Sequence, residues 1–341
     1  MIIRFIEFIK ILERIIDFII KKGYQLTPSF LRDKLNLIRL EKPKVYRPTA
    51  DISTILQWER MFDRYNLDGI EDELRNILAN LVITEEHHEQ NFDFSRIQSL
   101  SASKSFGCGH DYSINGSWFK DIASWGEGMY PGRKLSALDE ADWSDNIRHI
   151  EHEGFHKGSN IHVYYYTWFD RYLASNSGGS HHAALVAYQI KNQGMVYKRD
   201  ANITTYRINE PLIKKLDPYF CFITGSEAIT PCFGDFYLSL DWILTSFAVK
   251  KIYTFDMNAT ENNCTLFIVP KRDLIISPSI FESWLNSRAK TNEIIRFEDI
   301  LMEHARFCTT PYTHELRSIH LGDPTRRNDI EIRKHGLKGH P

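Results

Sequence analysis

The 341-residue sequence lacks a net charge of any size, and this absence limits the classes of partner that it suits. Its 42 Lys and Arg residues stand against 44 Asp and Glu residues, which gives a net charge of -2. General nucleic-acid-binding proteins usually have a clear basic excess, so we expect no general nucleic-acid binding. Because the charges balance and 13% of the residues are aromatic, the composition also excludes a disordered chain.

Closely spaced cysteines are also absent. The five cysteines contain no Cys-x-x-Cys pair, which excludes a zinc knuckle and a thioredoxin-type redox motif. Free, buried thiols in a reducing compartment are the simplest interpretation, so we expect a cytoplasmic location. The cysteines are Cys108, Cys221, Cys232, Cys264 and Cys308.

No stretch reaches the roughly 18 uncharged apolar residues that a transmembrane helix needs. The segment 1–22 comes closest, but charged residues interrupt it at steps of three and four, which predicts an amphipathic helix. Its acidic residues and the lack of a small-residue cleavage site argue against a secretory signal. This helix either packs on the protein or on a second copy, or lies on a membrane surface as a peripheral contact.

The remaining chain predicts an α+β fold with a mixed sheet core and an N-terminal helical region. We divide it into a helical region over 1–91, an α+β core domain over 92–324 and a basic flexible tail over 325–341. Strand-like runs dominate after residue 160, with helical patterns among them. The expected strands are 161–169, 203–208, 219–224, 236–240, 251–256 and 265–269, and the expected helices are 181–192, 279–287 and 297–307.

The most informative motif is a Gly-containing turn between a tyrosine-rich strand and an Ala-rich helix. It includes Asn176, Ser177, Gly178, Gly179 and Ser180. Such a turn can direct backbone N–H groups and the positive end of the helix dipole at an anion. We therefore expect these five residues to position a phosphate group.

Two histidines follow the turn at the start of the helix. His181 or His182 is the expected acid/base or charge-stabilising group, because an imidazole there lies beside a bound phosphate. Asp170 and Arg171 are the nearest charges along the sequence, and we expect them to support the site, Asp170 in catalysis and Arg171 in ligand binding. The same residues also fit a plain turn with a helix N-cap at Ser177 or Ser180.

The sequence Gly178-Gly179-Ser180-His181-His182 resembles the phosphate-binding turn of the ParB/sulfiredoxin superfamily. Sulfiredoxins carry Gly-Gly-Cys-His-Arg there, and the superfamily turn holds nucleotide phosphates at the start of a helix. Ser180 replaces the reactive cysteine, so sulfiredoxin thiol chemistry is not implied. His182 replaces the phosphate-gripping arginine. The resemblance covers about 25 residues and implies a nucleotide-binding hydrolase or transferase.

Three further patterns are less specific indications of a functional site. His149, His152, Glu153 and His156 share one helix face, either as a zinc site or as a solvated polar face. Residues 106–111 place a cysteine, a histidine and an aspartate close together, as a nucleophile or as part of a loop. Arg207, Ser226 and Glu227 loosely resemble elements of ADP-ribosyltransferases.

The leading hypothesis is a protein that binds a small phosphorylated ligand and catalyses phosphoryl transfer or hydrolysis at the Gly-Gly-Ser-His-His turn. The cofactor stays open, with ATP or another nucleotide and a divalent cation as candidates. The first alternative is a non-enzymatic interaction module that docks through residues 1–22. The second alternative is an ADP-ribosyltransferase-like enzyme.

Overall fold

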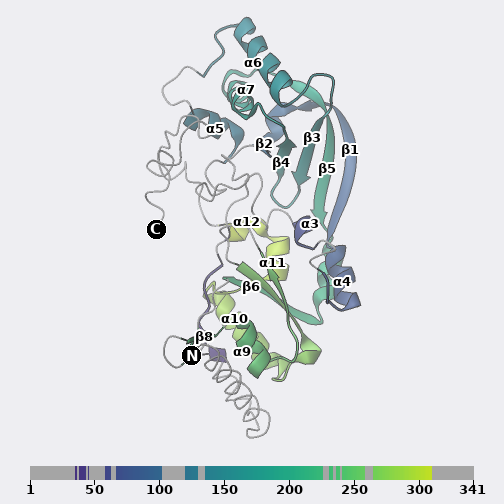
Figure 1. Ribbon diagram of the computed structural model, residues 1–341, viewed down its shortest axis with the longest axis vertical. Helices are drawn as coiled ribbons and strands as arrows, with labels where there is room; N and C mark the ends of the chain where they lie inside the picture. Colours follow the sequence, from purple (N-terminus) through teal and green to yellow (C-terminus); the bar gives the residue numbers. More distant parts are fainter. Residues whose placement is uncertain are drawn as a thin grey trace, which may run out of the picture.

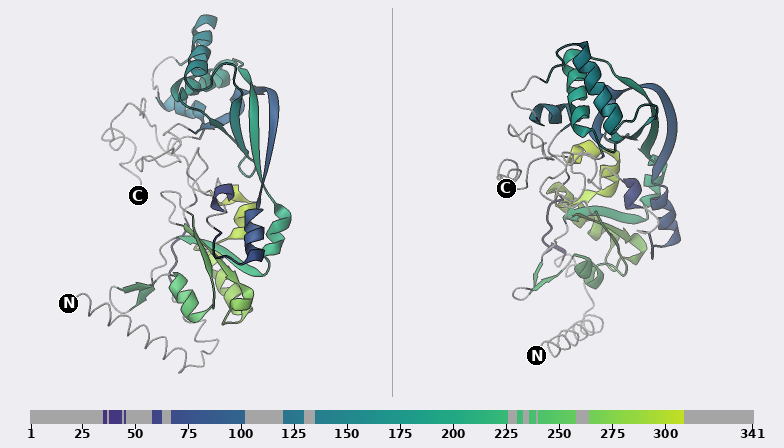
Figure 2. Two further views of the ribbon diagram at one scale, coloured as in Figure 1. Left: turned by 45° about the vertical axis from the view of Figure 1, so that its right-hand side comes forward. Right: turned by 45° about the horizontal axis from the view of Figure 1, so that its top comes forward.

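The computed structural model arranges the chain around two β-sheets, each with its own helices and hydrophobic core (Figure 1). Both views of Figure 2 keep the two sheets apart as separate layers along the long axis. The residues that the structure describes are 35–36, 38–43, 45, 58–62, 67–101, 120–129, 135–225, 230–232, 236–238, 240–257 and 264–308.

The first sheet is five-stranded and mixed, in the order β1-β5-β3-β4-β2. The outer pair β1/β5 and the inner pair β3/β4 are antiparallel, whereas β3 runs parallel to β5 and β2 runs parallel to β4. This pattern confirms the expected α+β fold with a mixed sheet. The strands are β1 (Val82–Asp93), β2 (Ile97–Leu100), β3 (Ile161–Tyr166), β4 (Arg171–Ser175) and β5 (Lys198–Ile208).

Three helices pack against this sheet. They are α5 (Ile122–Met129), α6 (Glu140–Glu153) and α7 (Ser180–Gln193). Helix α7 contributes small residues such as Ala183, Ala184 and Ala187 to the core, so its neighbours can approach it closely. The helices α5 and α6 both lie against α7, which is therefore the central helix of this layer.

The second sheet is antiparallel, in the order β11-β6-β10-β9, and helices cover both of its faces. Every residue of the two central strands is buried. Alternate side chains of β6 point to opposite layers: Cys221 joins the core with α3, α4 and α11, whereas Phe222 joins the core with α9 and α10. The strands are β6 (Tyr219–Gly225), β9 (Tyr253–Asp256), β10 (Cys264–Pro270) and β11 (Ile295–Arg296).

Shorter elements complete the described part of the chain. The helices around the second sheet are α3 (Trp58–Met61), α4 (Asp72–Ala79), α8 (Glu210–Ile213), α9 (Leu240–Phe247), α10 (Pro278–Lys290), α11 (Phe297–Met302) and α12 (His304–Phe307). The 3₁₀ turns are η1 (Phe94–Arg96), η3 (Lys214–Leu216) and η4 (Lys271–Asp273), and β7 (Thr230–Cys232) pairs with β8 (Phe236–Leu238).

An aromatic junction joins the two cores. Trp168 and Phe169, in the turn between β3 and β4, pack against both of them. The His304 ring stacks on Trp168 at 5.8 Å between centroids and meets the edge of Phe169 at 5.1 Å. The indole N–H of Trp58 donates a hydrogen bond to Nε2 of His304. Burial lowers the pKa of His304 to about 3, so the ring stays neutral.

The structure corrects one boundary of the predicted domains. Residues 82–91, expected to be helical, belong to β1, which pairs along its length with β5. Most residues of β1 are exposed, including His87 and His88. The predicted amphipathic helix over 1–22 and the predicted tail over 325–341 lie outside the described residues. Among the helices that are described, none has the length and apolar character needed to cross a membrane.

The buried His304 makes stability depend on acidity. An unfolded histidine takes up a proton below a pH of about 6.5, whereas folded His304 does not until about pH 3, so stability falls as the pH falls through this window. We expect the wild type to lose about 2 kcal/mol more than His304→Gln between pH 7 and pH 5. Glutamine keeps an acceptor for Trp58 but does not titrate. Urea unfolding at both pH values measures this, and equal losses in the two proteins would contradict it.

Candidate functional site

The Gly-Gly-Ser turn lies between β4 and α7, as the sequence predicts. Gly179 is the N-cap of α7 and has a left-handed backbone with φ of 68°. No side chain caps the helix. The side-chain amide of Asn176 donates to the Gly178 carbonyl at 2.7 Å and to the Ser180 hydroxyl at 2.9 Å. The turn therefore stabilises itself from within, and the predicted N-cap at Ser177 or Ser180 is wrong.

The glycines of this turn permit a close backbone contact with the end of α6. A methyl group on Gly154, the C-cap of α6, would overlap the carbonyl oxygen of Gly178. A methyl group on Gly178 would lie 2.9 Å from the Glu153 carbonyl oxygen. Gly154 and Gly178 are thus required for the packing of α6 against the turn, whether or not an anion binds.

This contact places the negative end of one helix dipole beside the positive end of another. The carbonyl oxygen of Glu153, the last residue of α6, lies beside Gly178 in the turn that opens α7. The Glu153 side chain also lies beside the turn, since a Cβ atom on Gly179 would be 3.5 Å from its Oε2. A carboxylate of the chain itself therefore lies close to the site expected for phosphate.

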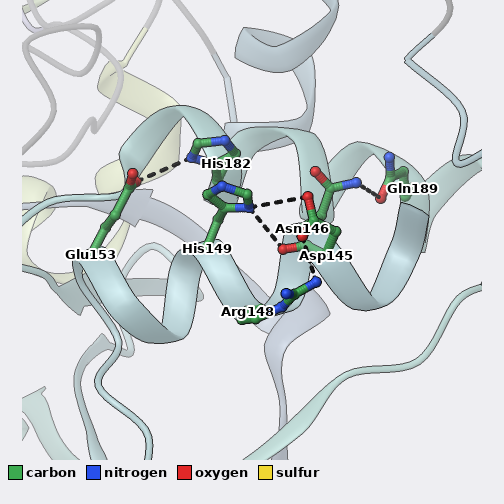
Figure 3. A network of polar contacts seen from close by, with 7 residues as sticks. All are labelled: Asp145, Asn146, Arg148, His149, Glu153, His182 and Gln189. Carbon is green, nitrogen blue, oxygen red and sulfur yellow. Dashed lines mark hydrogen bonds and ion pairs between the residues drawn. The ribbon is translucent and has the colours of Figure 1, made fainter. Parts of the chain in front are cut away.

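A histidine–carboxylate pair links the two helices at this point (Figure 3). Nδ1 of His182 lies 3.1 Å from Oε2 of Glu153, and a carboxylate can only accept, so Nδ1 carries the proton. Nε2 of His182 is then the nitrogen left to accept one. The side chains are 34% and 40% exposed, respectively, so the pair is open to small molecules.

His149 completes this cluster from one turn earlier on α6. Its ring stacks on that of His182, with centroids 4.5 Å apart and planes at 16°. Nδ1 of His149 donates to the backbone oxygen of Asp145 at 2.9 Å, which fixes the ring (Figure 3). Further along, the Asn146 amide approaches Oε1 of Gln189 at 3.4 Å. These contacts hold α6 and α7 in register.

The other predicted site residues are divided between the turn and more distant positions. His181 lies beside Trp125 of α5, with ring centroids 5.4 Å apart. Asp170 and Arg171 are at the opposite end of β4, and four residues of strand span roughly 13 Å. Asp170 and Arg171 therefore do not lie at the turn, contrary to the prediction that they support it.

Both residues have structural partners at that far end. The Asp170 carboxylate accepts from the Tyr165 hydroxyl at 2.8 Å. The buried Arg171 donates to the Ser99 hydroxyl at 2.8 Å and to the Lys120 carbonyl at 2.9 Å. Their position next to the turn in the sequence was misleading because β4 separates them from it.

The partner of His182 that the sequence did not reveal is Glu153. Its spacing with His149 placed both residues on one helix face, but the pattern contained no signal for pairing with His182, 29 residues later. Within the described residues, no group of three or more His, Cys, Asp or Glu side chains is suited to hold a metal ion. Helix α6 ends at Glu153, so His156 does not share the predicted helix face with His149 and His152, and both His152 and His156 are exposed.

The structure adds no support for the ADP-ribosyltransferase-like pattern or for a nucleophile within residues 106–111. Arg207 donates to Glu85 at 2.8 Å, and Ser226 and Glu227 lie outside the described residues, as does the segment 106–111. Three of the cysteines are buried thiols outside any disulfide, as expected, namely Cys221, Cys264 and Cys308. Burial raises the pKa of the Cys221 thiol, which makes it a poor nucleophile.

Comparison with known proteins finds one related family. It is described as a family of unknown function (DUF6685), and it matches residues 129–287 of the chain. This range includes all of α6, the turn and α7. Neither the curated proteins nor the solved structures contain a match.

The close contact between α6 and the turn predicts a difference between two glycine substitutions. Gly154→Ala should lower the free energy of unfolding by about 3 kcal/mol, because its methyl group meets backbone that cannot move aside. Gly158→Ala is the control. It lies in open space with φ of 86° and should cost only about 1 kcal/mol of strain. Chemical denaturation measures both, and equal losses would contradict the packing role of Gly154.

Proposed function

We propose that the protein is an enzyme that binds a small phosphorylated molecule, of the nucleotide class, at the start of α7 and catalyses phosphoryl transfer or hydrolysis. The observation that carries the proposal is the Glu153–His182 pair at 3.1 Å beside the N-terminus of a 14-residue helix. A carboxylate that holds one imidazole nitrogen leaves the other oriented for proton transfer. The resemblance of the turn to the ParB/sulfiredoxin superfamily supports the same ligand class.

The proposal assigns a distinct role to each part of the site. His182 is the acid/base group, and Glu153 orients its ring and balances its positive charge when it is protonated. The first-turn N–H groups of α7 bind phosphate oxygens together with the exposed Ser177 hydroxyl. Asn176 and Ser180 contribute indirectly, because their mutual hydrogen bond shapes the turn. His181 has the lesser role, at the Trp125 side.

Glu153 also restricts the ligand. Its carboxylate repels a phosphate group unless His182 is protonated or a divalent cation lies between the two anions. Binding of a nucleotide is therefore expected to be stronger with Mg²⁺ than without it. The glycines of the turn are not evidence for anion binding, since the packing of α6 already requires them.

Two substitutions test the acid–base role. Whichever of the phosphate compounds named below the wild type hydrolyses, His182→Ala should reduce the rate by about 10²–10⁴-fold, because the proton-transfer group is lost. Glu153→Gln should reduce it less, since the ring stays in place but its charge is no longer balanced. The substrates are ATP, AMP and p-nitrophenyl phosphate with Mg²⁺, and phosphate or nitrophenol release is the readout. The matched control is His152→Ala, which removes an exposed histidine next to Glu153 on α6 and should leave the rate unchanged.

Ligand binding is measured separately by thermal shift with ATP, AMP, inorganic phosphate and NAD. A ligand at 100 times its dissociation constant should add about 2.7 kcal/mol of stability. No shift with any phosphate compound, or shifts that are unchanged in His182→Ala and Glu153→Gln, would overturn the proposal. Nicotinamide release from NAD would favour the ADP-ribosyltransferase alternative instead.

A further inference from the structure

A cavity of about 340 Å³ lies beside β11, at the edge of the second sheet. The described residues that line it come from the segment 42–43, the end of α10, the turn into β11, β11 itself, and the helices α11 and α12. None of these described residues belongs to the first sheet or to α5, α6 or α7, so the cavity is separate from the α6/α7 site. A volume of this size is within the range of small-molecule pockets.

Positive charge predominates in the lining of this cavity. Three of the described lining residues are cations, namely Lys42, Arg296 and Arg306, whereas one of them, Asp299, is an anion. The whole chain, in contrast, has a net charge of -2. A concave surface with one predominant sign of charge raises the local concentration of ions of the opposite sign. The cavity therefore favours an anionic ligand.

The charges of these cations are available to a ligand. Within the described part of the chain, Lys42 and Arg296 form no ion pair, and Nη2 of Arg296 donates to the neutral Oδ1 of Asn286 at 2.8 Å. Arg306 pairs with Glu303 at 3.0 Å, but the two side chains are 66% and 58% exposed. Because an exposed ion pair of this kind is weak, an anion in the cavity can compete with Glu303 for Arg306.

Backbone hydrogen bonds fix the walls that carry these side chains. The carbonyl oxygen of Glu41, next to Lys42, accepts from the N–H of Gly225 at the end of β6 at 3.0 Å. At the end of α10, the carbonyl oxygen of Ala289 accepts from the N–H of Asn292 at 3.0 Å. The walls are thus formed before a ligand arrives, which lowers the cost of binding.

From these observations we infer that the cavity binds a small molecule that carries at least two negative charges in carboxylate or phosphate groups. The lining has an excess of two positive charges, which a ligand with two negative charges matches. Arg296 and Arg306 can each bind two oxygens of one anionic group through a planar guanidinium, and Lys42 supplies a point charge. This ligand is additional to the one proposed for the α7 turn.

The test is isothermal titration calorimetry of the full-length protein with citrate and with pyrophosphate, in buffer free of divalent cations. Wild type should bind one molecule of at least one of these probes. Lys42→Gln and Arg306→Gln should each weaken binding about 10-fold, because each removes a charge-assisted hydrogen bond. Both positions are exposed, and circular dichroism confirms that the variants are folded.

Two control variants separate this site from general surface charge and from the α7 site. Lys290→Gln removes an exposed lysine at the end of α10 that is not among the described lining residues, and it should change the affinity less than about twofold. His182→Ala should leave the affinity unchanged, since it removes the acid/base group of the other site. Failure of the function proposed for α7 therefore leaves this result intact.

The charge within the lining gives a test of opposite sign. Asp299→Asn should strengthen binding about threefold, because it removes the one carboxylate among the described lining residues. Tighter binding of citrate identifies carboxylate as the preferred group, and tighter binding of pyrophosphate identifies phosphate. The inference is overturned if neither probe binds wild type saturably, if Lys42→Gln and Arg306→Gln bind as tightly as wild type, or if Asp299→Asn binds more weakly.

Discussion

At Gly154 and Gly178 the backbones of two segments approach so closely that neither residue can carry a side chain. The end of α6 is thereby held against the turn that opens α7, and the two helix dipoles meet with opposite signs. The pairing of α6 with His182 in the candidate site depends on this contact. It brings Glu153 within hydrogen-bond distance of His182 and stacks His149 on the same imidazole.

The aromatic junction has a comparable role for the whole molecule. Trp168 and Phe169 belong to both hydrophobic cores, and His304 lies between them as a neutral ring. Because a charged imidazole would be poorly solvated there, burial lowers the pKa of His304 and the junction is most stable with a neutral ring.

The sequence predicts most elements accurately where the apolar pattern is strong. The expected helix over 181–192 corresponds to α7, and the expected strands over 219–224 and 265–269 correspond to β6 and β10. The main error is β1, where consecutive Glu and His residues gave no strand pattern. This strand is defined by its pairing with β5, from Val82 opposite Ile208 onward, and such long-range pairing leaves little local signal.

The sequence by itself determined the α+β class, the near-neutral charge and the strand–turn–helix that presents His182. Only the tertiary structure decided which side chains accompany that histidine. It brought in Glu153 from a separate helix and left Asp170 and Arg171 at the far end of β4. The physical reason is that the hydrophobic periodicity of a segment shows which of its faces is buried. Which side chains of two different helices meet depends instead on how the chain packs those helices together.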